Sequence, residues 1–328
     1  MMLSTETKMV GGEQELENEG LFYGVTNSGR SSLRWAIRSM SLQRKKVLVP
    51  DFVCQIVVDV LLEFNIDVQF YQVREDFEFE LPNELGSISA IYLVKYFGHE
   101  SHSFDKLIKN TDTPLIIDDV FGIEAPKIPA EVPWCYFNSL RKITAVADFS
   151  QLVSSTPLTE LRKERLPDFS TLKYKAKSAK YQYLNSSVGK ESDYLSLFSH
   201  AESLLDECSG VYEPEDRSVF LACQFSLHYR NEQKARVENL RVAKAALDSE
   251  QFIDINANFP SFLPLSLVNR DKVRKALMGH SIFLAVHWPK SRQAPSSLCD
   301  TILSLPLDSR YTTEDIKRIC DLIKKFEK

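Results

Sequence analysis

The sequence lacks the features that would place the chain in a membrane, outside the cell or on nucleic acid. No apolar run approaches the roughly 20 residues that a helix needs to span a bilayer. Residues 1–20 are polar and lack the apolar core of a secretory signal, so we interpret them as an arm. A net charge of -5 gives no basic excess for a nucleic-acid surface. We therefore expect a cytoplasmic protein that binds neither membrane nor nucleic acid.

The chain also lacks the residue spacing of a metal site. Its six cysteines form no CxxC pair and no Cys/His cluster. His99 and His102 have the separation of two metal ligands, but no third ligand accompanies them. We expect reduced, buried thiols, as is usual in the cytoplasm, and no metal.

What is present is the composition of an ordinary globular protein of 328 residues, with 44% hydrophobic and 26% charged residues. Strand-like and helix-like segments alternate, which predicts an α/β fold with a mostly parallel sheet. Strands are expected at 47–49, 68–73, 88–94, 115–117, 134–137 and 151–153. Helices are expected at 31–40, 56–64, 104–109, 192–208, 219–249 and 313–326, with a polar connection over 172–187. We expect a large domain over 21–210 and a smaller α+β domain over 211–328.

Two segments carry the strongest chemical signal. PLIIDDVFG predicts a buried strand that delivers Asp118 and Asp119 to its C-terminal end, and WCYFNSLRK predicts a strand that delivers Asn138, Ser139 and Lys142 to a comparable end. A pyridoxal phosphate enzyme needs an acid and an amine at one sheet edge. The lysine holds the cofactor as a Schiff base, and the carboxylate keeps the pyridine nitrogen protonated. From the residues alone, a surface lysine and two turn-capping aspartates remain the alternatives.

The order of several motifs resembles the DegT/DnrJ/EryC1/StrS family of pyridoxal-phosphate-dependent sugar aminotransferases. The resemblance runs from about Asn27 to the C-terminus and implies the aspartate-aminotransferase fold, known as fold type I. The segments that carry it are TNSGRSSLRWAI, VLVPDFVCQIVVDVLLEFNIDVQFYQV, AIYLVKYFGHE, PLIIDDVFG, SLRK and LSLPLDSRYTTEDIKRICDLIKKF.

The resemblance implies a role for each candidate cofactor residue. Lys142 would hold the cofactor. Side chains alternate along a strand, so only one of the two acids faces the pyridine nitrogen, and the resemblance implies Asp119 rather than Asp118, because Asp119 occupies the place of the second acid of the family's ED pair. The residues expected at the cofactor phosphate are Ser28, Gly29, Arg30 and Ser31 at a helix start, with Asn138 and Ser139 as further donors. For the glycine-containing helix start, a simple N-cap is the alternative.

The chain also departs from the family pattern. Cys54 falls near the position of an aromatic residue that stacks on the cofactor ring in many relatives. Gly122 stands where relatives often carry His or Gln, and ITAVADFSQLV replaces the usual glycine-rich stretch after the lysine. Candidate substrate residues are Tyr96, Tyr229, His287 and Trp288. Core packing is the alternative for Tyr96, and a buried, hydrogen-bonded imidazole is the alternative for His287.

The function implied is ping-pong transfer of an amino group from an amino acid such as glutamate to a keto sugar of the nucleotide-linked kind. The resemblance also implies a homodimer in which each subunit completes its neighbour's cofactor pocket. Two alternatives stay open: a non-catalytic or regulatory relative whose site has drifted, and a pyridoxal phosphate lyase or dehydratase on the same fold.

Overall fold

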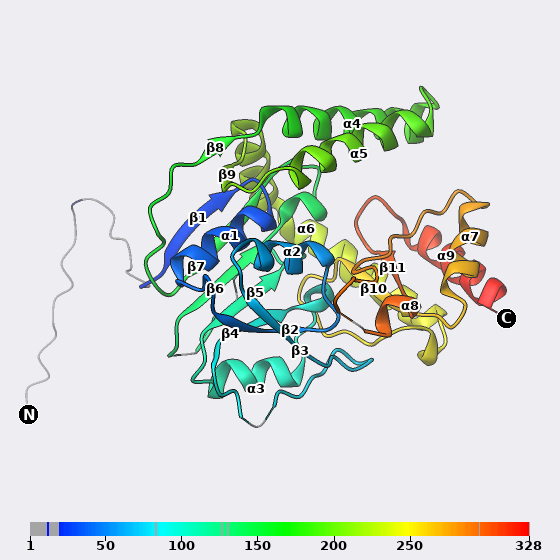
Figure 1. The fold of residues 1–328 in the computed structure, drawn as a ribbon. Helices are drawn as coiled ribbons and strands as arrows, with labels where there is room; N and C mark the ends of the chain where they lie inside the picture. The colour runs from blue at the N-terminus through cyan, green and yellow to red at the C-terminus, as the bar shows by residue number, and fades with distance from the viewer. Residues whose placement is uncertain are drawn as a thin grey trace, which may run out of the picture.

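The protein is described by a computed structural model, which covers residue 12 and residues 20–82, 84–125, 127–129, 131–294 and 296–327. Figure 1 shows an α/β body with a central sheet and a smaller C-terminal part beside it. In the described part of the chain, the main sheet has seven strands in the order β1-β7-β6-β5-β4-β2-β3. Its strands are β1 (Phe22–Thr26), β2 (Lys46–Pro50), β3 (Asp67–Tyr71), β4 (Ile88–Val94), β5 (Leu115–Asp119), β6 (Trp134–Asn138) and β7 (Ser150–Ser154).

The five strands from β3 to β6 in this order run parallel to their neighbours, whereas β7 is antiparallel to both β6 and β1. Every residue of β5 and β6 is buried, as expected for central strands covered on both faces. The structure therefore confirms the predicted α/β fold with a mostly parallel sheet. The expected strands are all present. The additional strand β1 lies at the sheet edge, where half-exposed residues give a weak sequence signal.

Helices cover the sheet and build the rest of the molecule (Figure 1). They are α1 (Gly29–Ser39), α2 (Gln55–Glu63), α3 (His102–Asn110), α4 (Pro167–Ser186), α5 (Glu191–Asp206), α6 (Asp216–Ala246), α7 (Arg270–Met278), α8 (Leu298–Thr301) and α9 (Thr313–Glu327). The helices α1 and α2 contact each other, and α1 contacts β6 and β7. None of the helices in these ranges combines the length and apolar character needed to cross a bilayer.

The expectation of a polar connection over 172–187 is wrong, because this segment belongs to the 20-residue helix α4. Pro167 and Asp168 lie in the first helical turn, where a missing N–H and a negative charge are both favourable. The helix packs along α5, and together they form a hairpin that projects from the body in Figure 1. Phe169 of α4 is buried in a cluster with Ala201 and Leu205 of α5. Tertiary packing thus stabilises a helix whose own amphipathic pattern is weak.

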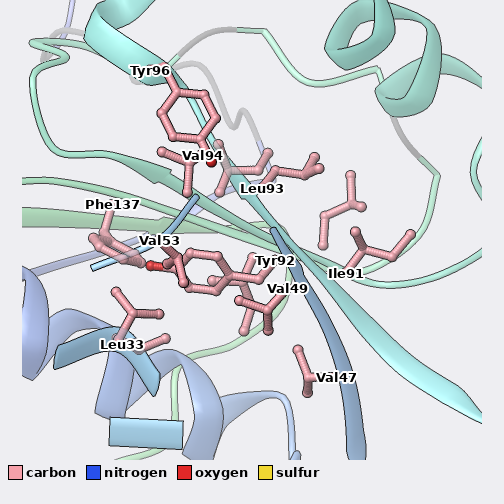
Figure 2. Close-up of a cluster of buried hydrophobic side chains, with 14 of the residues drawn as sticks. Leu33, Val47, Val49, Val53, Ile91, Tyr92, Leu93, Val94, Tyr96 and Phe137 are labelled. Carbon is pink, nitrogen blue, oxygen red and sulfur yellow. The ribbon is translucent and has the colours of Figure 1, made fainter. Parts of the chain in front are cut away.

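The main hydrophobic core lies between the sheet and its helices. Figure 2 shows Leu33 of α1, Tyr92 of β4 and Phe137 of β6 close together in this core. A second hydrophobic core consists of buried side chains from the segment 242–323. It surrounds the antiparallel pair β10 (Phe262–Ser266) and β11 (Ile302–Pro306). A short parallel pair, β8 (Glu164–Arg165) and β9 (Tyr212–Glu213), lies apart from the main sheet.

Candidate active site

A cavity opens at the C-terminal ends of the parallel strands. The start of α1, the start of α2, the end of β5 and the loop after β6 all contribute to its wall. The ionisable and hydroxyl side chains on the wall include Arg30, Asp118, Ser139, Arg141 and Lys142. This edge is where ligands bind in open α/β sheets, because the strand ends and helix starts converge there. The cavity therefore joins the two segments that carried the chemical signal in the sequence.

Asp118 is the carboxylate of the cavity. Its Oδ2 accepts a hydrogen bond of 2.6 Å from the hydroxyl of Tyr92, whereas its buried Oδ1 has no hydrogen-bond partner among the described residues. Burial raises the pKa of Asp118 to about 6, although the Tyr92 hydrogen bond and the charge of Lys142 act in the opposite direction. An acid with an unsatisfied oxygen beside an amine is suited to hold a ligand's protonated nitrogen.

The expectation that Asp119 faces the cavity is wrong. Asp119 lies on the opposite face of the sheet, 3.7 Å from the amine of the buried Lys95. Its Oδ2 accepts a hydrogen bond of 3.3 Å from Tyr136. Asp118 is paired in register with Phe137, which lines the cavity, whereas Asp119 is paired with Asn138. Paired residues of neighbouring strands point to the same face of the sheet. Asp118, and not Asp119, therefore lies on the cavity wall.

Lys142 supplies the amine, at the end of the 3₁₀ turn η2 (Leu140–Lys142). The residue is exposed, and it lines the cavity. Burial lowers the pKa of Lys142, and the charge of Arg141 adds to this effect, while Cys54 and Asp118 oppose it. Its Nζ lies 5.9 Å from the ring centre of Phe121. A reachable amine with a lowered pKa is the form that acts as a nucleophile.

The anion-binding end predicted at the start of α1 is only partly present. Gly29 and Arg30 line the cavity. Ser28 instead caps α1, because its hydroxyl accepts from the N–H of Ser31 at 3.3 Å. The hydroxyl of Ser31 donates to Asn27 Oδ1 at 2.8 Å. For Ser28 and Ser31, the simple N-cap is thus the interpretation that fits the contacts.

The loop after β6 contributes one of its two predicted donors. Ser139 lines the cavity, and its buried hydroxyl has no hydrogen-bond partner within the described ranges. Asn138 is turned away and fully used: its Nδ2 donates to Ile123 O and Gln151 Oε1, and its Oδ1 accepts from Gln151 N. Arg141, which the sequence analysis did not predict as a cofactor residue, also lines the cavity, and its buried Nε lacks a partner among the described residues.

The proposed substrate residues separate into two groups. Trp288 lines the cavity. The neighbouring His287 packs against two phenylalanines: the centre of its ring lies 5.0 Å from that of Phe121 and 4.6 Å from that of Phe262. Burial lowers the pKa of His287 to about 3, with a further contribution from the charge of Lys142, so the imidazole is neutral. Its Nδ1 lies 2.7 Å from Ser304 Oγ.

Tyr96 and Tyr229 do not line the cavity. Tyr96 is buried in the aromatic core, where its hydroxyl donates to the Phe52 carbonyl at 2.5 Å, as its core-packing alternative predicted. Tyr229 is half-buried on α6. Cys54, by contrast, lies on the cavity wall directly before α2.

The polar groups of the cavity fit pyridoxal phosphate. They comprise an amine, a buried carboxylate with one unsatisfied oxygen, and unsatisfied N–H and O–H donors from Arg141 and Ser139. Buried polar atoms without partners are rare in folded proteins, so their concentration on one cavity wall favours a polar ligand at this place. Lys142 would bind the cofactor covalently, Asp118 would face its ring nitrogen, and Arg30, Ser139 and Arg141 would hold its phosphate.

Comparison with known proteins shows similarity in fold but not in sequence. No family model matches the chain, and no curated protein sequence matches it. Among solved structures, it is similar to PseC of Helicobacter pylori, an aminotransferase involved in the biosynthesis of pseudoaminic acid, with 14% identity and a TM-score of 0.63. The alignment covers 93% of this chain and 86% of PseC.

Two further structures agree. A DegT DnrJ EryC1 StrS aminotransferase from Brucella abortus has 13% identity and a TM-score of 0.61, and the alignment covers 93% of this chain and 86% of that one. DesI, solved in the presence of its TDP-sugar product, has 12% identity and a TM-score of 0.62, with coverage of 93% and 80%. The Brucella abortus protein carries the name of the family that the sequence resembles, and the chain has the fold of these neighbours, that of the type I pyridoxal phosphate enzymes.

Proposed function

We propose that this protein is a pyridoxal-phosphate-dependent aminotransferase of the DegT/DnrJ/EryC1/StrS type. It transfers an amino group from an amino acid such as glutamate to a keto sugar, which we infer to be nucleotide-linked. The observation that carries the proposal is the placement of Lys142 and Asp118 on one cavity wall, together with the unsatisfied donors of Ser139 and Arg141. The sugar part is supported by the likeness to DesI, whose structure was solved in the presence of its TDP-sugar product.

The chemistry divides between the cofactor and the chain. When bound, pyridoxal phosphate supplies an electron sink next to the reacting carbon. Lys142 provides the amine that binds the cofactor and then carries a proton on Nζ, for which its lowered pKa is favourable. The carboxylate of Asp118 holds a proton on the ring nitrogen, and the Tyr92 hydrogen bond fixes its orientation. The neutral His287 and the rings packed around it, including Phe121, form a mostly apolar wall beside Lys142.

Cofactor trapping tests the proposal. The purified chain is titrated with pyridoxal phosphate, reduced with borohydride and digested, and the modified peptide is identified by mass spectrometry. We expect the label on Lys142, and no label in a Lys142→Ala variant. The matched control is Lys177→Ala: burial lowers the pKa of Lys177 to about 7, but its amine donates to the Thr144 carbonyl and does not line the cavity. Labelling of another lysine, or none, would contradict the assignment.

The reaction class is tested separately with the loaded protein. Incubation with glutamate and no acceptor should release one equivalent of 2-oxoglutarate, because an aminotransferase completes the donor half-reaction alone. Addition of a nucleotide-linked keto sugar should then restore turnover. Elimination products from amino acids or sugars would favour the lyase or dehydratase alternative. Cofactor binding without either half-reaction would favour the non-catalytic alternative.

A further inference from the structure

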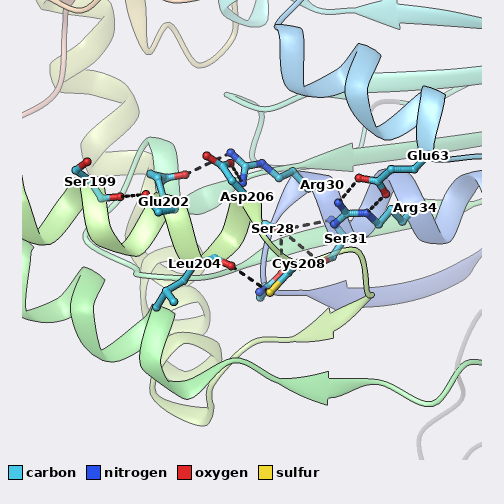
Figure 3. A network of polar contacts seen from close by, with 12 residues as sticks. Ser28, Arg30, Ser31, Arg34, Glu63, Ser199, Glu202, Leu204, Asp206 and Cys208 are labelled. Carbon is cyan, nitrogen blue, oxygen red and sulfur yellow. Dashed lines mark hydrogen bonds and ion pairs between the residues drawn. The ribbon is translucent and has the colours of Figure 1, made fainter.

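The two arginines of the cavity wall are held from behind by one carboxylate. Glu202 of α5 accepts a hydrogen bond of 2.8 Å from Arg141 Nη1, and its Oε2 lies 3.5 Å from Arg30 Nη2. Figure 3 shows Arg30 pointing from the start of α1 toward Glu202 and Asp206 on α5. Glu202 itself does not line the cavity. The carboxylate therefore does not compete for the ligand position; it contacts the arginines on their far side.

The contact is built from several elements of the chain. Lys173 of α4 also donates to Glu202 Oε1, and Asp206 lies 2.6 Å from Arg30 Nη1. The side chains of Arg30, Arg141 and Lys173 are 14%, 12% and 9% exposed, so solvent screens them little. Burial alone would raise the pKa of Glu202, but Arg141, Lys173 and Arg30 outweigh it and lower that pKa. Glu202 is thus charged at every physiological pH.

Without Glu202, the cations would repel one another. The positive charge of Arg141 acts to lower the pKa values of both Arg30 and Lys142, which shows that these charges lie within electrostatic range. A guanidinium has five N–H donors in a fixed plane, so binding one of them fixes the direction of the others. Arg141 donates from Nη1 to Glu202, and its buried Nε has no partner among the described residues, so Nε is left to bind a ligand.

We propose that Glu202 is a positioning residue for the anion end of the site. It fixes Arg30 and Arg141 so that their remaining donors bind a phosphate monoester dianion together with Ser139, and it links the α4–α5 hairpin to that site. The inference rests on the proposed function in taking this anion to be the cofactor's phosphate. A phosphate group of the substrate has the same chemistry, so the test must separate the two.

Ligand binding by a Glu202→Gln variant of the full chain tests the proposal. Affinity is measured for pyridoxal phosphate and for pyridoxal, which lacks the phosphate. We expect pyridoxal phosphate to bind about tenfold or more weakly to the variant than to the native protein, on the scale of about one charged hydrogen bond. Pyridoxal should bind equally to both. Protection of the native protein from thermal unfolding by inorganic phosphate should be lost in the variant.

Glu63→Gln is the matched control, because Glu63 makes the same kind of contact without reaching the cavity. Its carboxylate binds Arg34 of α1 through two hydrogen bonds of 2.7 Å (Figure 3). Glu63 and Glu202 are 34% and 33% exposed, but Arg34 does not line the cavity. We expect the Glu63 variant to bind pyridoxal phosphate as the native protein does. Glu202→Asp keeps the charge with a shorter side chain, and it should fold and give an intermediate affinity.

The outcomes separate this inference from the proposed function. If the native protein binds pyridoxal phosphate and the Glu202 variant binds both pyridoxal phosphate and a nucleotide sugar as tightly or more tightly, the positioning role is refuted. Equal losses for pyridoxal phosphate and pyridoxal would also refute it, because they would indicate general disruption of the site. If pyridoxal phosphate binding is unchanged and only a nucleotide sugar binds more weakly, the anion is the substrate's and the cofactor assignment is overturned. If the native protein binds no pyridoxal phosphate, the proposed function fails, and protection by inorganic phosphate still decides the role of Glu202.

Discussion

Asp118 and Asp119 are neighbours in the sequence, but their carboxylates lie on opposite faces of the sheet. Asp118 accepts from Tyr92 and faces the cavity, whereas Asp119 contacts Tyr136 and Lys95 on the other side. Each aspartate thus has its own amine: Lys142 acts on the charge of Asp118, and Lys95 acts on that of Asp119. Of these pairs, only the first lies on the cavity wall, and this decides how the two acids should respond to mutation.

We expect Asp118→Asn to reduce turnover far more than Asp119→Asn. The first change keeps the shape and the Tyr92 hydrogen bond but removes the charge that holds the proton on the cofactor ring. The loss should be about 3 kcal/mol or more in activation free energy, or at least a hundredfold in rate. Asp119→Asn should stay within about tenfold of the native rate, because it acts only from the opposite face. Steady-state kinetics of the two variants with saturating cofactor would decide, and the reverse order would contradict the assignment.

Asp118→Asn should also make the cofactor-free protein more stable at neutral pH. Folding raises the pKa of Asp118 from 3.8 to about 6, so the folded protein binds a proton more tightly than the unfolded chain. The resulting stability is present below pH 4 and is lost as the pH rises through 6. Asparagine does not titrate, so the variant should exceed the native protein by on the order of 2 kcal/mol at pH 8 and match it near pH 4. Urea unfolding at both pH values measures the difference, and an equal gain at both would exclude the titration of Asp118 as its source.

The site shows how much the sequence alone could predict. The lysine, the cavity edge and the α/β fold follow from motifs whose strands are strongly apolar, and the structure has all three. The choice between the acids rested on the family's second acid, whereas the structure places Asp118 on the cavity wall. Strand alternation shows only that one of the two acids faces the cavity, not which one. Ser139 shares the parity of Phe137, and Phe137 is paired with Asp118, so one correct assignment would have fixed the other.

Other features could not be predicted from sequence because they depend on long-range contacts. Glu202 lies on α5 and meets Arg30 and Arg141 only when the α4–α5 hairpin packs beside the body. No local pattern marks it, since a glutamate on a helix is usually solvated. The helical state of α4 was missed for a related reason, because its buried face exists only against α5.

Gly122→Ala should destabilise the fold. A Cβ at this position would lie 2.2 Å from Asp119 Oδ2 and 2.6 Å from the Tyr136 hydroxyl, in a buried environment. The collision would displace the hydrogen-bonded pair and lower the free energy of unfolding by about 1–3 kcal/mol.

Gly29→Ala is the comparison for this test, because its Cβ would meet Phe137 at 3.3 Å and the ring can shift slightly. Chemical denaturation should show a clearly larger loss for the Gly122 variant. Similar losses for the two variants would mean that the Asp119–Tyr136 pair adapts to the added methyl group.

We expect a homodimer, with light scattering at micromolar concentration giving about twice the 37.5 kDa chain mass. Phe220 and Leu227 of α6 are 62% and 72% exposed and lie two helical turns apart on one face, so α6 offers an apolar surface. The apolar stripe of α1, by contrast, is buried in the chain's own core. Leu227→Lys should shift the protein toward monomer, whereas Leu62→Lys, at another exposed leucine, should not. An active monomer would contradict a shared site.

The pairing of β1 with β7 also determines when the cavity can form. Thr26 lies opposite Ser150 in this pair, and α1, with Gly29 and Arg30, begins directly after β1. The lysine loop lies between β6 and β7. The N-terminal strand must therefore wait for β7 to be synthesised before it can enter the sheet. Because such distant pairings form slowly, the anion end and the lysine end of the site should come together late in folding, and recovery of cofactor binding would then follow, rather than precede, formation of the parallel strands.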